Sequence, residues 1–292
     1  MHPFSINPSF ELVNEDTLEP AAVKKNVLVI GGGVAGMEAA FVAKKRGHNV
    51  VLCEAAQELG GQARLAAVPI GKQDLTRVIQ FMARRLYDSG VDVRLNIVVT
   101  QDMLEAEFKG WEVIAAAGAK ANTIPAFTCF KNWMTADDIL AGRAFPGQNV
   151  VIIGGGSVGC ELADFLAPTL NDRFPRNRKI TVLEMAPEIM MTEGGVVRSK
   201  LAMRMMEKGV RIETGAKVTA VTEDSIAFER DGVETVLKGA DTLVFANGYH
   251  VDNELEELLK AADCTYHLIG DGAKVGNIKD AISGAYELAR ML

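Results

Sequence analysis

The chain alternates between short apolar runs of strand length and longer segments in which apolar residues recur at helical spacing. The runs Val27–Ile30, Val50–Cys53 and Val150–Ile153 are rich in β-branched residues, which favours buried strands. Helical spacing is clearest in Lys72–Ser89, where five apolar residues mark one face: Leu75, Val78, Ile79, Met82 and Leu86. Strands that alternate with helices predict an α/β protein with parallel sheets.

One stretch departs from this alternation. Between residues 210 and 245, short runs of alternating apolar and polar residues are separated by turns at Glu223-Asp224 and Asp231-Gly232. The pattern predicts four short strands, which are Lys217–Val221, Ser225–Phe228, Glu234–Leu237 and Thr242–Phe245. We therefore expect a small antiparallel element late in the chain.

The first apolar run leads directly into a glycine fingerprint. Val27–Ile30 is followed by Gly31-x-Gly33-x-x-Gly36 and then by an alanine-rich helical pattern. Glycines at this spacing permit a tight turn, let a pyrophosphate approach the backbone and let the helix pack closely on the strand. Val34 and Ala35 begin the helix, where free N–H groups and the helix dipole favour a phosphate. This context predicts a dinucleotide site.

The next strand ends in an acid. Val50–Cys53 is followed by Glu54, 18 residues after Gly36, and then by Ala55. A carboxylate at this position accepts hydrogen bonds from the two ribose hydroxyls of an adenosine. We therefore assign Glu54 and Ala55 to the adenosine end of the first site.

The whole pattern occurs a second time, 123 residues further along the chain. A second apolar run leads into a second glycine fingerprint, and the strand Lys179–Leu183 again ends in a glutamate. The residues assigned to this second site are Gly154, Gly156, Ser157, Val158, Gly159 and Glu184. An internal duplication of this kind predicts two nucleotide sites.

Three further segments are expected close to a bound cofactor. A loop with paired glycines follows Glu54, and two later strands end in small residues that let the chain pass near a cofactor. The residues assigned in these segments are Gly61, Gln62 and Arg64 in the loop, Ala117 and Gly118 after the first strand, and Asn247 and Gly248 after the second.

Composition narrows the class of partner. The chain has 292 residues, enough for two domains, and its net charge of -7 argues against nucleic acid or an anionic membrane. Its four cysteines form no C-x-x-C pair, which favours a reducing compartment and predicts neither a disulfide framework nor a zinc site. No signal peptide and no apolar run of ~20 residues is present, so we expect a cytoplasmic protein.

With both fingerprints and a late Gly-Asp pair, the chain resembles the flavoproteins that have two dinucleotide-binding domains. In that family one domain binds FAD, a second domain inserted in it binds NAD(P)H, and the chain returns to complete the first. The resemblance implies two Rossmann-like domains after an arm or linker at 1–22. The FAD-binding domain is expected at 23–127 and 249–292, and the NAD(H)-binding domain at 128–248.

The same resemblance assigns further residues. Gly270 and Asp271 match the segment whose acid binds the flavin ribityl chain, and Ala281 and Ile282 match a helix start near the flavin pyrimidine ring. Glu161, two residues after the last fingerprint glycine, matches the position that reaches the nicotinamide carboxamide; a plain helix-surface glutamate is the alternative.

A closer resemblance is to the C-terminal half of the iron–sulfur flavoenzymes related to old yellow enzyme. These include enoate reductases, dienoyl-CoA reductase and trimethylamine dehydrogenase, and the resemblance rests on Ser5–Pro8, Leu59–Ala66 and Ile278–Ile282. In that family a barrel that holds FMN and an iron–sulfur cluster precedes this module. The last cluster cysteine of the family corresponds to Ser5 here, so we expect the chain to hold no such cluster and to lack the barrel.

These features predict an FAD-dependent oxidoreductase module that oxidises NADH and passes electrons from FAD to another centre. The acceptor is expected to be an FMN and iron–sulfur barrel or a separate protein. NADH is favoured over NADPH because a 2′-phosphate would meet Glu184, and Met185–Pro187 offers no basic residue. The cofactors carry out the chemistry, so we assign no catalytic side chain and no metal ligand.

Two alternatives remain open. One is a stand-alone NADH oxidase or quinone reductase. The other is a non-catalytic nucleotide-binding domain, because the equivalent region of trimethylamine dehydrogenase holds ADP. A disulfide reductase is disfavoured, since Cys129 has no partner cysteine in the sequence around it.

Overall fold

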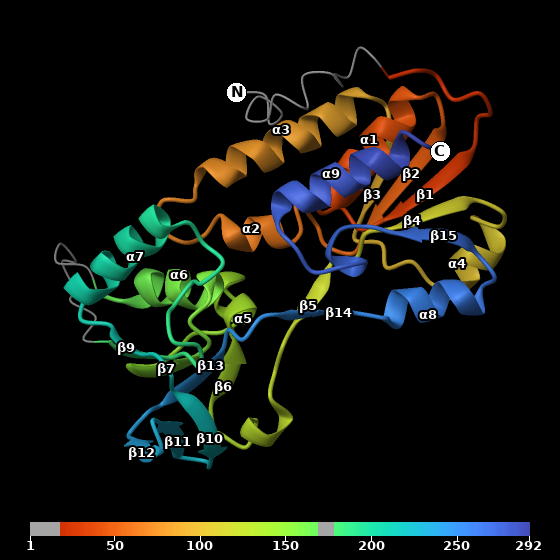
Figure 1. Ribbon diagram of the computed structural model, residues 1–292. Helices are drawn as coiled ribbons and strands as arrows, with labels where there is room; N and C mark the ends of the chain where they lie inside the picture. Colours follow the sequence, from red (N-terminus) through yellow and green to blue (C-terminus); the bar gives the residue numbers. More distant parts are fainter. Residues whose placement is uncertain (1–17, 169–177) are drawn as a thin grey trace. The chain divides into compact units, whose positions relative to one another are not determined.

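The computed structural model describes residues 18–168 and 178–292 (Figure 1). Ser5 and most of the predicted arm lie outside these residues. The chain forms two compact units. The first comprises the chain up to Ala67, Asp74–Lys120 and Val251–Leu292, and the second comprises Val68–Gln73 and Ala121–His250. The domain limits given above stay a prediction, since compact packing does not by itself assign a cofactor to either unit.

The first unit is built on a five-stranded parallel sheet in the order β15-β4-β1-β2-β3. The central strand β1 (Asn26–Ile30) pairs with β2 (Asn49–Glu54) on one side and β4 (Glu112–Ala115) on the other. β3 (Asp92–Leu95) and β15 (Thr265–Leu268) form the two edges. From β1 the chain continues to β2 and β3 on one side and then crosses back to β4 on the other side of β1. The carboxyl ends of β1 and β4 therefore form the switch point where open α/β sheets bind ligands.

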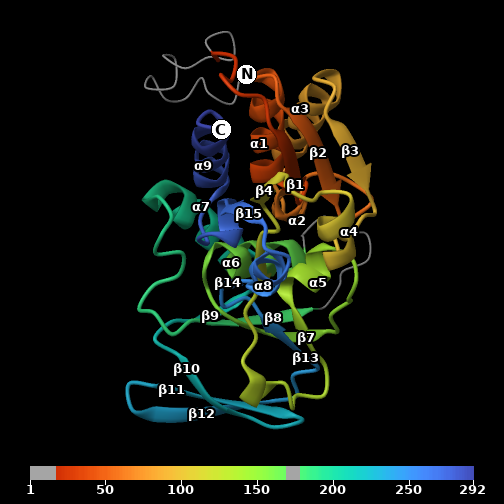
Figure 2. The ribbon, with the colours of Figure 1, turned by 90° about the vertical axis from the view of Figure 1, so that its right-hand side faces the viewer.

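Two layers of helices cover this sheet. One layer contains α1 (Val34–Lys45), α2 (Gln62–Ala66), α3 (Asp74–Asp88) and α9 (Ile278–Ala289), and the other contains α4 (Gln101–Ala106) and α8 (Glu254–Ala261). Figure 2 shows α1 beside α9, and the two helices are in contact. Val27 and Val29 pack on the first layer and Leu28 and Ile30 on the second. Burial of both faces explains why β1 is apolar from Val27 to Ile30.

The second unit repeats this plan. Its five-stranded parallel sheet has the order β6-β13-β7-β8-β9, with β7 (Asn149–Ile153) at the centre. β7 pairs with β8 (Lys179–Leu183) and β13 (Thr242–Phe245), and the edges are β6 (Trp133–Thr135) and β9 (Arg211–Glu213). In both units the fingerprint glycines directly follow the central strand. The predicted fold class, an α/β protein with two Rossmann-like domains, is therefore confirmed.

The prediction that Thr242–Phe245 belongs to the antiparallel element is wrong, because this strand is buried throughout and pairs in parallel with β7 and β6 as β13. The three preceding strands form an antiparallel sheet that covers one face of the second unit, as the alternating pattern predicted. Its strands are β10 (Lys217–Val221), β11 (Ser225–Arg230) and β12 (Val233–Lys238). Ile226 and Phe228 pack against Val151 and Phe245 of the large sheet. The helices α5 (Ala136–Leu140), α6 (Ser157–Leu166) and α7 (Gly195–Glu207) lie on the opposite side in Figure 1.

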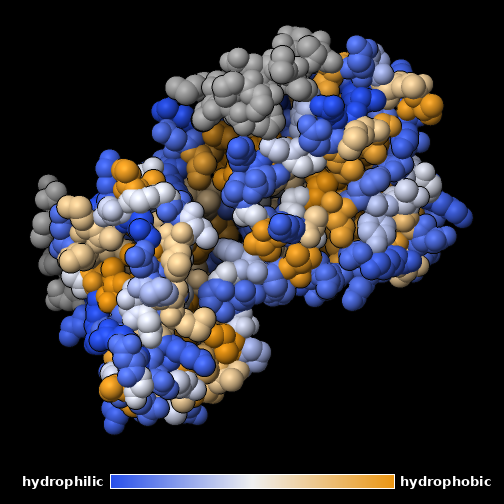
Figure 3. Space-filling view, in the orientation of Figure 1, coloured by the Kyte–Doolittle hydropathy of each residue, from blue (hydrophilic) through white to orange (hydrophobic). Residues whose placement is uncertain are grey.

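Helix α7 was not anticipated from the sequence. Leu201 and Met205 are buried, whereas Val196, Met203 and Met206 are 71%, 61% and 70% exposed. Figure 3 shows apolar surface over this helix. Because its apolar residues lie on both faces, the segment has no single apolar stripe to indicate a helix.

Two short strands, β5 (Ala119–Ala121) and β14 (Tyr249–Val251), form a separate two-stranded sheet. Within residues 18–168 and 178–292, no helix combines the length and the apolar character needed to cross a membrane.

Candidate cofactor sites

The three glycines of the first fingerprint differ in what a Cβ atom at each position would contact. Gly31 has a φ of 106°, and a Cβ there would overlap the carbonyl oxygen of Ala116. A Cβ on Gly36 would overlap the carbonyl oxygen of Gly31. A Cβ on Gly33 would meet nothing within 4 Å, so the space in front of this residue is open. The first and third glycines are therefore required by the fold, whereas the second leaves room for a ligand.

The second fingerprint repeats this geometry. Gly154 has a φ of 109°, and a Cβ there would overlap the carbonyl oxygen of Ala246. A Cβ on Gly159 would overlap the carbonyl oxygen of Gly154, and a Cβ on Gly156 would meet nothing within 4 Å. The two units thus present equivalent open spaces beside equivalent turns.

Both open spaces lie at helix N-termini. In α1 the amide of Met37 donates to the Gly33 carbonyl at 2.9 Å, and in α6 the amide of Cys160 donates to the Gly156 carbonyl at 3.0 Å. The N–H groups of Ala35 and Gly36 in α1, and those of Ser157, Val158 and Gly159 in α6, have no acceptor among the described residues. Val34 directly follows the parallel bridge that joins Gly33 to Gly60, so its N–H faces the loop after β2. Free N–H groups at the positive end of a helix fit a pyrophosphate.

The two strand-end acids are held in the same way. Glu54 accepts hydrogen bonds from the amides of Gly32 and Ala56 at 2.5 and 2.7 Å. Glu184 accepts from the amides of Gly155 and Ala186 at the same two distances. A carboxylate has about four acceptor positions, so each acid keeps capacity for ribose hydroxyls. Ala55 follows Glu54 at the same strand end.

The loop after β2 lies on the first fingerprint. The Gly60 amide donates to the Gly32 carbonyl at 2.8 Å, and a Cβ on Gly61 would lie 3.1 Å from the Gly33 Cα. Gln62 begins α2 and donates to the Ala119 carbonyl at 2.8 Å. Gly61 therefore lies beside the second glycine of the fingerprint, and Gln62 follows it at the start of α2. Nearby, Arg64 forms an exposed ion pair with Glu58.

The C-terminal segment closes the same region. A Cβ on Gly270 would lie 2.9 Å from the Ala35 Cβ, and a Cβ on Gly272 would lie 3.5 Å from the Gly118 carbonyl oxygen. Asp271, within the short helix η4 (Gly270–Gly272), accepts a hydrogen bond from the Gly276 amide at 2.9 Å. Ala281 is buried in the cluster that contains Ala35, and Ile282 packs against that cluster. Segments far apart in sequence, including the one that ends in Ala117 and Gly118, thus meet at the N-terminus of α1.

In the second unit, a small pocket lies beside the fingerprint. Its lining includes Val158 of α6, Ala246 and Gly248 after β13, and Tyr249. Across it the Tyr249 hydroxyl donates to Asp137 at 2.7 Å. The neighbouring Asn247 has a buried side-chain oxygen that has no hydrogen-bond partner within the part of the chain that the structure describes. An unsatisfied buried acceptor at this position suits a ligand hydroxyl or amide.

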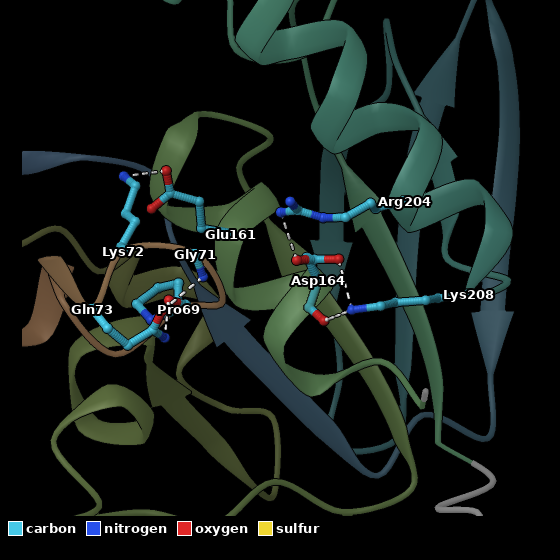
Figure 4. Close-up of polar contacts among 8 residues, drawn as sticks. All are labelled: Pro69, Gly71, Lys72, Gln73, Glu161, Asp164, Arg204 and Lys208. Atoms are coloured by element: carbon cyan, nitrogen blue, oxygen red, sulfur yellow. Dashed lines mark hydrogen bonds and ion pairs between the residues drawn. The ribbon is translucent and has the colours of Figure 1, made fainter. Parts of the chain in front are cut away.

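Glu161 is not a plain surface residue. Its side chain is 13% exposed and forms an ion pair with Lys72 (Figure 4). Lys72 belongs to the segment Val68–Gln73, which packs with the second unit although it lies between α2 and α3 in sequence. Sequence reasoning missed Lys72, because a lysine in a turn 89 residues before its partner leaves no local signal.

One turn further along α6, a buried carboxylate fixes the neighbouring helix. Asp164 is 1% exposed and accepts from Arg204 at 2.9 Å and from Lys208 at 2.8 Å. Arg204 lies in α7 and Lys208 directly follows it, so the pair of cations holds α7 on α6 (Figure 4). Two cations on one buried acid indicate a structural role.

The cysteines do not form a redox pair in the structure. Cys53, Cys129, Cys160 and Cys264 are all free. Burial, followed by the charges of Glu184 and Glu161, raises the pKa of Cys160 to about 12, so this thiol is unreactive near neutral pH. Among the described residues, no cluster of His, Cys, Asp and Glu could hold a metal ion.

Residues 25–268 match the model of a protein family described as pyridine nucleotide-disulphide oxidoreductases. The chain is 32% identical to a cinnamate reductase of Clostridium sporogenes and 31% identical to an NADH oxidase of Thermoanaerobacter brockii. These alignments cover 98% and 93% of this chain and 42% of each relative. A solved structure of 2-naphthoyl-CoA reductase superimposes with a TM-score of 0.86 at 26% identity, covering 98% of this chain and 43% of that one. The chain therefore spans less than half the length of these relatives.

Proposed function

The chain belongs to the pyridine nucleotide-disulphide oxidoreductase family, whose members bind FAD and NAD(P)H, and from this premise we propose that it is the NADH-oxidising module of an enoate-reductase-like flavoenzyme. The observation that carries the proposal is the duplicated site. Each unit has an open space at the second glycine of its fingerprint, free amides at a helix N-terminus and an acid fixed at the next strand end. One unit can hold FAD and the other NADH.

For FAD, the first unit supplies contacts along the length of the cofactor. The fingerprint amides and the Gly61 loop face the pyrophosphate, and Glu54 faces the adenosine ribose. Asp271 is assigned to the ribityl chain, and the first turn of α9 with Ala281 and Ile282 to the flavin ring. These assignments are supported by the meeting of the assigned segments at the carboxyl ends of β1 and β4.

For NADH, the second unit supplies the corresponding contacts. Gly156 and the N-terminus of α6 are assigned to the pyrophosphate, and Glu184 to the adenosine ribose. Asn247 and the pocket lined by Val158 and Gly248 are assigned to the nicotinamide half, and Glu161 to its carboxamide. Lys72 orients Glu161 for this contact through their ion pair.

When bound, the two cofactors supply the redox chemistry, a hydride passing from the nicotinamide to the flavin and electrons leaving toward an acceptor. The protein binds and orients them. We propose that the acceptor is an FMN and iron–sulfur barrel or a separate protein, as in the flavoenzymes that the sequence resembles. A reducing, cytoplasmic compartment is proposed because all four cysteines are free.

The test begins with the purified protein. We expect a yellow protein whose acid-released flavin is FAD, one per chain, without FMN or iron. Anaerobic NADH should bleach the flavin, and ferricyanide should be reduced catalytically. FMN as the released flavin, or an iron–sulfur absorption shoulder, would contradict the assignment.

The ligands and electron acceptors that the purified protein uses distinguish the electron-transfer module from the two alternative functions. A colourless protein that binds only ADP would favour the non-catalytic nucleotide-binding domain. Fast turnover with oxygen or quinones would favour a self-sufficient oxidase, a possibility raised by the relative named NADH oxidase. We expect no saturated product from enoates or enoyl-CoA esters with this chain alone. Catalytic formation of such a product would overturn the proposal of an electron-transfer module.

A further inference from the structure

The two units provide an internal comparison of their cofactor loops. In the first, the Gly60 amide donates to the Gly32 carbonyl at 2.8 Å; in the second, the Met190 amide donates to the Gly155 carbonyl at 2.8 Å. The loop after β8 therefore lies on its fingerprint as the loop after β2 does. Both contact residues have a positive φ, 117° at Gly60 and 49° at Met190, so the second loop places a methionine in the left-handed region that favours glycine.

The two loops diverge after this contact. Beyond Gly60, the first loop continues through Gly61 into α2 and brings no carboxylate to the N-terminus of α1 among the described contacts. Beyond Met190, the second loop continues to Glu193, whose amide donates back to the Met190 carbonyl at 3.0 Å. The Glu193 side chain reaches α6, where its Oε1 accepts a hydrogen bond from the Ser157 hydroxyl at 2.7 Å.

Ser157 is the first residue of α6, and the equivalent residue of α1 is Val34. The Glu193 carboxylate is therefore hydrogen-bonded to the first residue of the helix whose N-terminus we assign to the NADH pyrophosphate. A carboxylate there gains from the helix dipole in the way that a phosphate does. It also engages the one hydroxyl at this helix start that can donate to a phosphate.

We propose that Glu193 is a displaceable anion at the nucleotide site of the second unit, and that its negative charge lowers the affinity of this site for NAD(H). This inference rests on the proposed function, because it takes the N-terminus of α6 as the pyrophosphate site. In the structure Glu193 accepts a hydrogen bond from the Ser157 hydroxyl. A dinucleotide must break this hydrogen bond and bring negative charge next to the carboxylate, which favours release of the nucleotide after oxidation.

The exposure of Glu193 limits the size of the effect. Because its side chain is exposed, water and salt screen its charge, and we expect a change of about threefold to tenfold in affinity at low ionic strength. Since the screening length falls from ~30 Å at 0.01 M salt to ~3 Å at 1 M, the change should shrink as salt is added.

The test is calorimetric titration of the FAD-loaded protein with ADP-ribose and with NAD⁺, neither of which reduces the flavin. Glu193→Gln keeps a hydrogen-bond acceptor but removes the charge, and Glu193→Ala removes both. Glu207→Gln is the matched control, because Glu207 is an exposed acid at the other end of α7.

We expect Glu193→Gln to tighten both ligands about threefold to tenfold at 20 mM salt, with most of the gain lost at 500 mM, and Glu207→Gln to change nothing. Unchanged or weaker binding by Glu193→Gln, or an equal gain in Glu207→Gln, would overturn the inference. A lower melting temperature with unchanged affinity would show that Glu193 only supports the start of α7. If neither the wild type nor any variant binds ADP-ribose, the proposed nucleotide site itself fails, and the role of Glu193 fails with it.

Discussion

An alanine at Gly156 would place a methyl group in the space that we assign to the pyrophosphate of NADH. Gly156 has φ and ψ of -69° and -174°, an extended conformation that alanine adopts readily. Its Cβ would meet no protein atom within 4 Å. The variant should therefore fold normally and lose only its ligand.

Two opposing terms set the expected change in stability. Replacing glycine at a compatible position stabilises a fold by ~0.4–1 kcal/mol through the unfolded chain. Alanine is a poorer helix N-cap than glycine, which costs up to about 1 kcal/mol. We therefore expect the free energy of unfolding of Gly156→Ala to stay within about 1 kcal/mol of the wild type. The affinity for NADH should fall at least tenfold, ~1.4 kcal/mol, because the methyl group and the phosphate oxygens compete for the same space.

Three matched variants make the comparison decisive. Gly33→Ala should impair FAD retention instead of NADH affinity. Gly159→Ala should lose stability as well, by about 1–3 kcal/mol, since its Cβ would overlap the Gly154 carbonyl oxygen. Gly284→Ala, on the exposed side of α9 with nothing near its Cβ, should leave both cofactors unaffected.

The measurements are thermal unfolding by circular dichroism and the NADH dependence of flavin reduction in anaerobic stopped flow. Wild-type affinity in Gly156→Ala would show that the pyrophosphate does not lie there. A large loss of stability in the same variant would refute the steric argument itself.

Four further outcomes are expected. NADH should reduce the flavin at least about tenfold more effectively than NADPH at low concentration, ~1.4 kcal/mol, and Glu184→Gln should narrow this ratio; equal rates for the wild type would contradict the role of Glu184. Cys129→Ser should keep NADH-to-dye turnover within a few-fold, whereas a loss on the order of a hundredfold, ~2.7 kcal/mol, would reveal a redox thiol. Burial and the neighbouring cations lower the pKa of His48 from 6.5, so the unfolded chain binds more protons below that pH. The melting temperature should therefore fall as the pH drops from about 6.5, and His48→Gln should flatten this dependence. Lys72→Met should weaken NADH binding and Lys72→Arg should restore it; an equal effect of Lys72→Met in a Glu161→Gln background would show that the ion pair is not the cause.

The duplicated plan of the chain could be predicted because its signals are local. The glycines at 31, 33 and 36, the preceding apolar strand and the following helix all lie within the one continuous segment 26–45. Their steric demands act on the backbone of that same segment, so they leave a regular pattern. The strand-end acids and the short strands Lys217–Val221 and Thr242–Phe245 were identified for the same reason.

Local sequence patterns did not predict the elements whose position depends on tertiary packing. Helix α7 has exposed and buried apolar residues on both faces, so its periodicity is weak. Its place in the fold depends instead on the buried Asp164, which accepts from Arg204 and Lys208. The position of an acid within α6 does not indicate which distant cations will pair with it.

The sequence by itself thus determined the class of fold, the presence of two fingerprints and the backbone of each, because these depend on sterics and burial within short segments. The tertiary structure decided which side chains from distant segments contact the second fingerprint helix. Lys72 pairs with Glu161, and Glu193 reaches Ser157 across 36 residues of sequence. Charged side chains at a surface are compatible with many partners, and only the folded chain selects one by bringing the two within contact distance.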